Sequence, residues 1–280
     1  MRIGTLTIVG VGLIGGSIGL AARRRGLAGR VIGVGRQPAT LERARQLGAI
    51  DEACLDLADA VRRADVAVFC TPVTLIAEQV RAAAPGCAAG TLLTDAGSTK
   101  GSIVRALDGH LPPGVSFVGS HPLAGSEKRG PEHADADLFQ GRVTVVTPAP
   151  GTDRAAVERT VAFWQALDSR VLLMGPEEHD RALAMTSHLP HLVASALAGI
   201  LPPELRELTA SGFRDTTRVA AGDPSLWTGI FLQNRAALID SLGILQEQVN
   251  QFQTALQAGD PAAIDALLAR GKRSRDALGN

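Results

Sequence analysis

The chain has 280 residues, of which 45% are hydrophobic and 20% are charged, the composition of a globular protein long enough for two domains. Its 28 basic and 28 acidic residues cancel to a formal net charge of zero, so a nucleic-acid partner has no electrostatic support. No apolar run approaches the ~20 residues of a membrane span, and Met1–Thr5 enters a strand directly, with no signal peptide before it. We therefore expect a cytoplasmic protein without a membrane partner.

The three cysteines, Cys54, Cys70 and Cys87, are isolated in the sequence and form no C-x-x-C pair. Small apolar side chains in a reducing compartment are expected, rather than metal ligands or a disulfide. No metal site is predicted.

The first element is a short apolar strand, Thr5–Val9, that runs into the pattern G-x-G-x-x-G at Gly10, Gly12 and Gly15. In a dinucleotide-binding unit the first glycine allows a tight turn, the second lets a pyrophosphate approach the backbone, and the third lets the next helix pack close to the sheet. A helix over residues 13–25 would present its N-terminal N–H groups to the phosphates. An ordinary glycine-rich turn is the alternative. The predicted cofactor contacts here are Gly10, Gly12, Leu13, Ile14 and Gly15.

A second strand, Arg30–Val34, follows at the distance that a βαβ unit needs. In NAD-binding units this strand usually ends in an acidic residue that accepts hydrogen bonds from the ribose 2′-OH. Here the loop reads Gly35-Arg36-Gln37, so no carboxylate repels a 2′-phosphate, and the Arg36 guanidinium suits one. We predict NADP as the cofactor, ahead of NAD. The alternative is that Arg36 is a solvated loop charge.

Apolar strands alternate with helical stretches through the first half of the chain. Further strands are expected at residues 66–70, 92–94, 115–119, 143–147 and 170–174, with a helix at 153–167. Such alternation is typical of a parallel, doubly wound sheet, whose ligands bind beyond the strand ends. Thr71 and Pro72, which end one strand, are predicted cofactor contacts. The fold class is therefore α/β, with a doubly wound Rossmann-type N-terminal domain over residues 1–174.

After Gly175-Pro176 the pattern becomes helical, which predicts a second, all-helical domain over residues 175–280. One helix is expected over His179–Gly199, interrupted at Pro190 and kinked near His188.

A long helix is expected from Asp223-Pro224, an N-cap carboxylate followed by proline, to about Gln257. It carries a narrow apolar seam of coiled-coil type. The members of the seam are spaced 4-3-4-3-4: Leu238, Leu242, Leu245, Val249, Phe252 and Leu256. Packing within one subunit also explains this seam, but a helix of ~50 Å beside a small domain favours a homodimer. Asp260-Pro261 opens a last helix.

The chain contains no tyrosine, which leaves its six histidines as the main candidates for acid–base chemistry. His121 follows a strand on the predicted ligand side, within the segment Gly119–Lys128. An imidazole, with an ordinary pKa near ~6.5, can accept a proton from an alcohol as hydride departs. A hydrogen-bonded structural histidine is the alternative. His110 and His133 lack this context and are expected at the surface.

Two arginines four residues apart, Arg214 and Arg218, precede the long helix. They suit an anionic substrate, because the guanidinium fork matches a carboxylate. A surface salt bridge with Asp215 is the other explanation.

Five ordered motifs resemble the prephenate/arogenate dehydrogenase family of tyrosine biosynthesis along nearly the whole chain. They are Gly10–Gly16, Asp95-Ala-Gly-Ser-Thr-Lys-Gly101, Gly119-Ser-His-Pro-Leu-Ala-Gly-Ser-Glu-Lys128, Ser187-His-Leu-Pro190, and Gly212-Phe-Arg-Asp-Thr-Thr-Arg-Val219 through Asp223-Pro-Ser-Leu-Trp227. The resemblance implies a nucleotide-binding domain, a helical domain that mediates an intertwined dimer, and oxidative decarboxylation of a cyclohexadienol. The product would be 4-hydroxyphenylpyruvate from prephenate, or tyrosine from arogenate.

By position, the resemblance implies roles for single residues. His121 matches the histidine that hydrogen-bonds the ring hydroxyl and takes its proton, and Ser98 matches a serine that assists there. Arg218 matches the arginine that holds the ring carboxylate, and His188 matches a histidine of the substrate pocket. The remaining candidates are Glu127 and Asp215, which match acidic partners of that arginine, the pocket-wall aromatic Trp227, and the neighbouring Arg214.

Two other functions fit parts of the pattern. A β-hydroxyacid dehydrogenase has a similar domain order but relies on a catalytic lysine in its second domain, where this chain has only Lys272. A nonenzymatic NADP-binding sensor is the other alternative, and the set Ser98, His121 and Arg218 argues against it. Prephenate and arogenate differ only at their side chains, and the pair Glu127-Lys128 favours prephenate.

Overall fold

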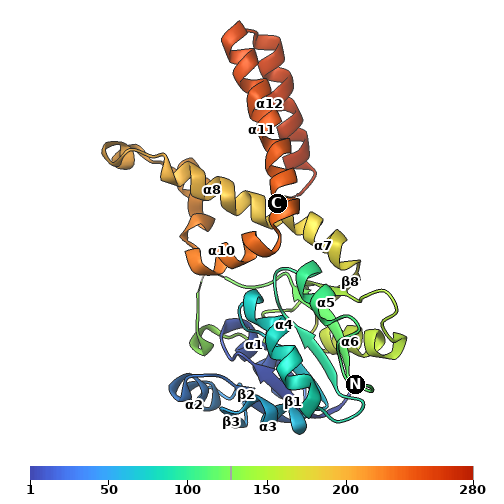
Figure 1. Cartoon of the computed structure of the whole chain (residues 1–280). Coiled ribbons are helices and arrows are strands. Elements are labelled where there is room, and N and C mark those ends of the chain that lie inside the picture. Colours follow the sequence, from blue (N-terminus) through green and yellow to red (C-terminus); the bar gives the residue numbers. More distant parts are fainter. Residues whose placement is uncertain (127, 280) are drawn as a thin grey trace. The chain divides into compact units, whose positions relative to one another are not determined.

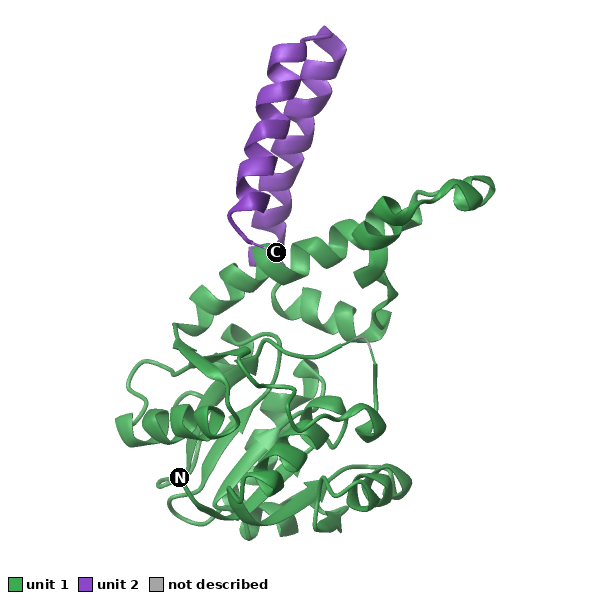
Figure 2. Cartoon of the chain, turned by 180° about the vertical axis from the view of Figure 1, so that it is seen from behind, with its two compact units in different colours: residues 1–234 green, residues 235–280 purple. Residues whose placement is uncertain are grey.

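The structure is a computed structural model that describes residues 1–126 and 128–279 (Figure 1). It forms two compact units, Met1–Asn234 and Arg235–Asn280 (Figure 2). This division follows packing and does not test where a nucleotide-binding domain ends, so the boundary after residue 174 stays a prediction. None of the helices in the described ranges combines the length and the apolar character needed to cross a bilayer.

The larger unit is built on one eight-stranded sheet with the order β3-β2-β1-β4-β5-β6-β7-β8. Its strands are β1 (Ile3–Val9), β2 (Ala28–Val34), β3 (Glu52–Cys54), β4 (Val66–Phe69), β5 (Leu92–Asp95), β6 (Ser116–Pro122), β7 (Val143–Thr147) and β8 (Arg170–Leu173). All neighbouring pairs are parallel except β6 and β7, which are antiparallel. The predicted doubly wound α/β class is confirmed, but the short strand β3 and the antiparallel pair were not predicted.

The chain changes its direction across the sheet at β1. It first moves outward to β2 and β3, and then returns to place β4 on the other side of β1, with Val9 beside Phe69. In a doubly wound sheet the ligand crevice opens at such a point, at the carboxyl ends of the strands. Gly10 and Thr71 lie next to each other there, because a Cβ on Gly10 would be 3.0 Å from Thr71 Cγ2.

Helices cover both faces of the sheet, and each face buries its own apolar cluster. These helices are α1 (Leu13–Arg24), α2 (Pro38–Gln46), α3 (Leu57–Arg62), α4 (Val73–Ala83), α5 (Gly101–Leu107) and α6 (Arg154–Ala166). Helices α1 and α6 pack with Ile8 on one face, whereas α3, α4 and α5 pack with Phe69 on the other. Since both faces are covered, the loops at the carboxyl edge remain to build a site.

Strand β6 continues three residues further than predicted. We expected it to end at Gly119, whereas it runs to Pro122 because its last residues pair with β7, His121 lying opposite Val145. On its other side β6 pairs with β5 only as far as Val118. His121 therefore lies on a strand, beyond the end of the parallel neighbour.

The single helix predicted over His179–Gly199 is three segments. They are α7 (Pro176–Leu183), a π-helical stretch (Ala184–His188) and α8 (Leu189–Gly199). Pro190 has no N–H to donate, and a π-helical turn is one way in which a helix absorbs such a loss. The interruption expected near His188 thus takes the form of a widened turn that ends at that residue.

The prediction of one long helix after Asp223 is wrong, because the structure has two helices there. They are α10 (Pro224–Gln233) and α11 (Arg235–Ala258), separated by Asn234, which has φ −110° and ψ 28°. Asn234 is buried, and its side-chain amide donates to the Asp180 carbonyl oxygen at 2.7 Å. A long-range contact of this kind holds the residue out of the helical geometry that the local sequence favours.

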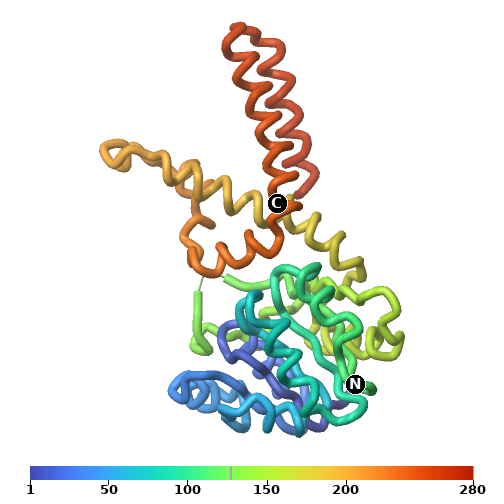
Figure 3. Tube along the Cα trace, in the orientation of Figure 1, coloured from blue at the N-terminus to red at the C-terminus, as the bar shows by residue number. Residues whose placement is uncertain are grey.

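The smaller unit is a hairpin of α11 and α12 (Pro261–Asp276) (Figure 3). Asp260 caps α12, as predicted, and its Oδ1 accepts hydrogen bonds from the Ala262 and Ala263 N–H groups at 3.0 Å. The predicted seam is mixed in exposure: Leu238 is buried, Leu242, Leu245 and Phe252 are half-buried, and Val249 and Leu256 are exposed. Apolar side chains left exposed along one helix are typical of an interaction surface.

Candidate active site

The glycine pattern forms the turn between β1 and α1. Gly10 has φ +93°, a left-handed conformation that favours glycine. A Cβ on Gly15 would lie 2.2 Å from the Gly10 carbonyl oxygen, so a side chain there would push α1 away from the turn. A Cβ on Gly12 would meet no atom within 4 Å, which leaves open space in front of the backbone where a pyrophosphate is predicted.

The N-terminus of α1 fits a bound phosphate group. Its N-cap residue, Gly12, has no side chain to cap the helix, and the first turn contains no acidic residue. The first N–H groups of a helix lack intrahelical partners, and with the helix dipole they favour an anion. Leu13, Ile14 and Gly15 supply these groups, so the residues present fit the predicted dinucleotide.

The loop after β2 carries the predicted determinant for NADP. Arg36 is exposed, and none of the ion pairs within the described ranges includes it. Gln37 is the N-cap residue of α2, and its Oε1 accepts a hydrogen bond from Thr40 Oγ1 at 3.2 Å. At the end of β4, Thr71 Oγ1 donates to Gln79 Oε1 at 2.5 Å. The other predicted contacts in these two loops are the half-buried Gly35 and the exposed Pro72.

A buried ion pair fixes the end of β6. Lys100 and Asp95 are fully buried and pair with each other. Asp95 Oδ1 also accepts from the Ser120 backbone N–H at 3.0 Å, and Lys100 Nζ donates to the Ser120 carbonyl oxygen at 2.9 Å. Trp164 Nε1 donates to Ser120 Oγ at 2.9 Å. The residue before His121 is therefore held through all of its polar groups.

His121 contacts a second histidine, which comes from α7. Its Nδ1 lies 2.9 Å from His179 Nε2, and His179 Nδ1 lies 2.9 Å from Asp180 Oδ1. The Asp180 carboxylate also accepts from the backbone N–H groups of Lys100 and Gly101, each at 2.8 Å. Burial, and then the neighbouring His179, lowers the pKa of His121 well below its ordinary value. The His121 ring is therefore neutral at pH 7 and able to accept a proton.

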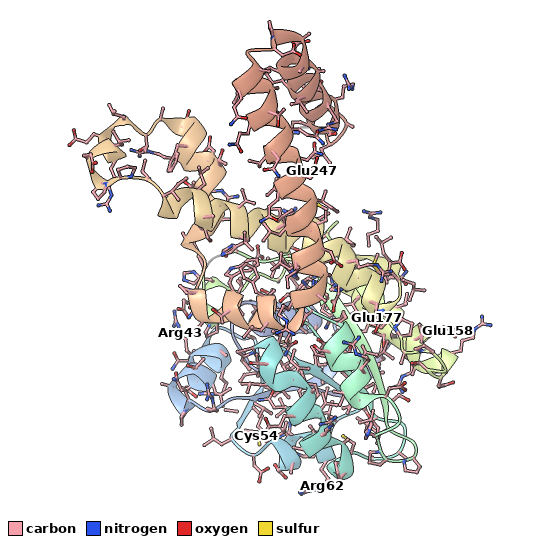
Figure 4. All side chains as sticks on the ribbon, turned by 45° about the horizontal axis from the view of Figure 1, so that its top comes forward. Arg43, Cys54, Arg62, Glu158, Glu177 and Glu247 are labelled. Atoms are coloured by element: carbon pink, nitrogen blue, oxygen red, sulfur yellow. The ribbon has the colours of Figure 1, made fainter. Side chains whose placement is uncertain are left out.

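Helix α7 has two different faces. Glu177 is exposed (Figure 4). It pairs with Arg105 of α5 at 2.6 Å. His179 and Asp180, in contrast, are only 0% and 8% exposed. The helix thus directs one imidazole and one carboxylate inward, to the end of β6.

His188, at the end of the π-helical stretch, is 1% exposed. Asn234 Nδ2 lies 3.0 Å from His188 Nδ1, and because an amide N–H donates, His188 Nδ1 accepts and the ring hydrogen is on Nε2. Within the described part of the chain Nε2 has no hydrogen-bond partner. Burial lowers the pKa of His188 to about 4, so at neutral pH it is an uncharged donor, suited to a ligand oxygen.

Trp227 of α10 lies in an aromatic cluster beside His188. Its ring stacks on His191 at a centroid distance of 3.6 Å and an interplanar angle of 13°, and His188 meets it edge-on at 6.2 Å. Gly222 packs closely against the cluster, because a Cβ there would lie 2.5 Å from Trp227 Nε1. Trp227 is itself half-buried, so part of its ring stays accessible.

The predicted arginine cluster is exposed. Arg214 and Asp215 lie on α9 (Ser211–Thr217), and Arg218 begins a 3₁₀ turn that follows it. Among the described residues, neither arginine forms an ion pair with Asp215, and no hydrogen bond joins the cluster to His121. A role for these three residues in the substrate pocket stays a prediction.

The structure says little about two further residues predicted for the site, Ser98 and Glu127. Ser98 is half-buried in the loop between β5 and α5. Glu127 lies outside the described residues.

Several buried polar residues of the site were not predicted, among them Lys100, His179, Asp180 and Asn234. The adjacent pair His179-Asp180 in a helical segment carries a usable signal, because a histidine next to a carboxylate is a common unit of acid–base sites. Nothing local in the sequence distinguishes Asn234, which acts through contacts distant in the chain.

Comparison with known proteins identifies the family of the chain. Residues 18–173 match the nucleotide-binding domain of prephenate dehydrogenase, and residues 175–270 match the prephenate dehydrogenase dimerization domain. The chain belongs to the prephenate dehydrogenase family.

Individual members resemble the whole chain. A cyclohexadienyl dehydrogenase from Zymomonas mobilis is 35% identical over 279 residues, which cover 97% of this chain and 94% of the relative. The prephenate dehydrogenase of Aquifex aeolicus, solved with hydroxyphenyl propionate and NAD+, has a TM-score of 0.92 at 30% identity and covers 99% of both chains. An arogenate dehydrogenase from Synechocystis has a TM-score of 0.84 at 32% identity, over 98% of this chain and 99% of its own.

These similarities confirm the family that the five motifs predicted, and with it the enzyme class, a nicotinamide-dependent decarboxylating dehydrogenase. They support use of a nicotinamide dinucleotide, without distinguishing NADP from NAD.

Proposed function

We propose that the protein, as a homodimer, oxidatively decarboxylates prephenate or arogenate in tyrosine biosynthesis, with NADP ahead of NAD as the hydride acceptor. The observation that carries this proposal is the position of His121. It is a neutral imidazole at the carboxyl edge of the sheet that also carries the phosphate-binding turn. The dimer is supported by the match to a dimerization domain and by the apolar side chains exposed along α11.

The cofactor would be held at the sheet edge by the start of α1 and by the loop after β2. The N–H groups of Leu13, Ile14 and Gly15 would bind the pyrophosphate, and Arg36 would bind a 2′-phosphate. When bound, an oxidised nicotinamide supplies the hydride acceptor.

The other candidate residues would bind the substrate and accept its proton. His121 accepts the proton of the ring hydroxyl, and Ser98 assists there. His188 donates Nε2–H to a substrate oxygen, and Trp227 lies against the ring. Arg218 holds the ring carboxylate, but it must not trap this group, because the carboxylate leaves as carbon dioxide. Loss of carbon dioxide aromatises the ring and makes the reaction irreversible.

One assay tests the proposal directly. Purified protein is mixed with prephenate or arogenate and with NADP or NAD, and absorbance of the reduced nicotinamide is followed. The proposal expects turnover with at least one of the four combinations. Cofactor binding without turnover of either cyclohexadienol would overturn the proposed substrates.

The Arg36→Ala variant tests the choice of cofactor. We expect the KM for NADP to rise about 10- to 100-fold and the KM for NAD to change less than about twofold, because a charge-assisted contact contributes about 1.5–3 kcal/mol. Steady-state kinetics with both cofactors measure the difference. Arg43→Ala, an exposed arginine of α2 (Figure 4), is the matched control. An equal change for both cofactors would remove Arg36 from phosphate recognition.

The Arg218→Met variant tests recognition of the ring carboxylate. Loss of the guanidinium is expected to raise the substrate KM at least about 10-fold, for the same energetic reason, while the KM for the cofactor stays unchanged. Arg206→Met, at another exposed arginine of the same region, is the control. If both variants behave alike, Arg218 is a solvated surface charge.

A further inference from the structure

The contacts behind His121 form a row of three side chains. His121 Nδ1 lies 2.9 Å from His179 Nε2, and His179 Nδ1 lies 2.9 Å from Asp180 Oδ1. The two imidazole rings meet at 66° with their centroids 5.1 Å apart, so each ring presents an edge nitrogen to the next group. His179 is fully buried, and its hydrogen bonds to His121 and Asp180 lie within this row.

The hydrogens in this row have one consistent arrangement. A carboxylate is only an acceptor, and Asp180 already accepts from the backbone N–H groups of Lys100 and Gly101. The hydrogen between Asp180 and His179 is therefore on His179 Nδ1. In a neutral imidazole the other nitrogen then accepts, so His179 Nε2 accepts from Nδ1–H of His121. This leaves the lone pair of His121 on Nε2.

The surrounding charges favour this arrangement. Burial opposes ionisation of Asp180, but hydrogen bonds from His179, Lys100 and Gly101 outweigh it and lower the pKa of that carboxyl. Burial lowers the pKa of His179, against the opposing hydrogen bond to Asp180. The other charged or titratable groups that face the pair are Lys100, Asp95 and His188. A charged Asp180 beside two neutral rings is therefore the state at pH 7.

We propose that His179 is a positioning residue for the proposed dehydrogenase reaction: oriented by Asp180, it fixes the tautomer of His121 so that Nε2 of His121 is the proton acceptor. Without this partner, the hydrogen of a neutral His121 is free to occupy Nε2, and a ring in that tautomer has no lone pair for the substrate.

The proton balance of the step is simple. The O–H bond of the substrate breaks and its proton forms an N–H bond at His121 Nε2. The C–H bond of the carbinol carbon breaks as well, a C=O bond forms at that carbon, and the hydride would pass to the oxidised nicotinamide of the proposed function. His121 becomes an imidazolium that still donates Nδ1–H to His179. The Asp180 carboxylate, one residue further along the row, stabilises that positive charge, as the acidic member of a catalytic triad does.

Two substitutions of His179 separate positioning from packing. Glutamine places an amide oxygen near the position of Nε2 and retains an acceptor for His121, whereas leucine fills space without one. We expect His179→Leu to lower kcat about 100-fold or more with KM within about threefold, and His179→Gln to recover at least a tenth of the wild-type kcat. His133→Leu, at an exposed histidine, is the control.

A spectroscopic readout tests the same inference without any turnover. ¹⁵N NMR of histidine-labelled protein, with the His121 signals assigned by comparison with His121→Asn, should show Nδ1–H and an unprotonated Nε2 in the wild type at pH 7. His179→Leu should shift the His121 signals towards the Nε2–H tautomer, and His179→Gln should not. Thermal melting and cofactor-induced fluorescence changes check that each variant is folded.

The inference rests on the proposed function only where it is tested by kcat of the His179 variants. If the tautomer changes as expected but no cyclohexadienol is turned over, the proposed function fails and the positioning role stands. A wild-type His121 with its hydrogen on Nε2, or equal loss of kcat in the leucine and glutamine variants while both remain folded, overturns the positioning role.

Discussion

Replacing His121 with asparagine is expected to lower kcat by about 10³ and to change the substrate KM by less than about threefold. A general acid or base typically raises the rate about 10²–10⁴-fold, and asparagine removes the proton acceptor. The asparagine amide N–H can still donate to His179 in place of Nδ1–H of His121. Steady-state kinetics with the preferred substrate and cofactor measure the split between kcat and KM. His133→Asn, at an exposed histidine, provides the comparison.

The pH profile gives the same prediction a second readout. Only the unprotonated ring accepts a proton, and burial lowers the pKa of His121 well below the ordinary value of 6.5. Activity should therefore be fully present at neutral pH and should decline as the pH falls through the lowered pKa, below pH 6.5. This limb of kcat/KM is expected to vanish in His121→Asn. A variant with near-normal kcat, or with the limb intact, would show that another group takes the proton.

The features of the fold that the sequence predicted well are local ones. The turn at Gly10 and the close packing at Gly15 follow from what single glycines allow in a strand–turn–helix, and the structure contains both. The alternation of strands and helices likewise predicted a doubly wound sheet. His121 lies at the carboxyl edge of this sheet, where ligands were predicted to bind.

The features that were missed depend on partners far apart in the sequence. A helix through residue 234 is what local propensity favours, and only the contacts of Asn234 with Asp180 and His188 explain the break. The extension of β6 to Pro122 needs the antiparallel strand β7, whose direction no local pattern encodes. His179 was assigned only to a helix, because its contact with His121 joins residues 58 positions apart.

The Lys100→Met variant is expected to destabilise the protein by about 3–5 kcal/mol, the cost of removing one partner from a buried ion pair. Lys100 and Asp95 are both 0% exposed. Without the ammonium group, Asp95 keeps its hydrogen bonds from Ser120 and Gly97 but is left as a buried charge without a counter-ion. The Ser120 carbonyl oxygen also loses its donor. Thermal melting should show a decrease in Tm of about 10 °C.

Two comparisons identify the cause of that loss. Lys272→Met removes an exposed lysine that pairs with Asp276 in α12, and its Tm should change by less than about 2 °C, because exposed ion pairs contribute little. The double variant Asp95→Asn/Lys100→Met leaves no unpaired buried charge, so its loss should be smaller than the sum of the two single losses. Equal changes in Tm for Lys100→Met and Lys272→Met, or strictly additive losses in the double variant, would mean that the buried pair does not support the end of β6.

A fall in kcat is also expected in Lys100→Met, measured at a temperature below its lowered Tm. The ion pair holds the backbone at the end of β6, and this backbone aligns His121, the proton acceptor.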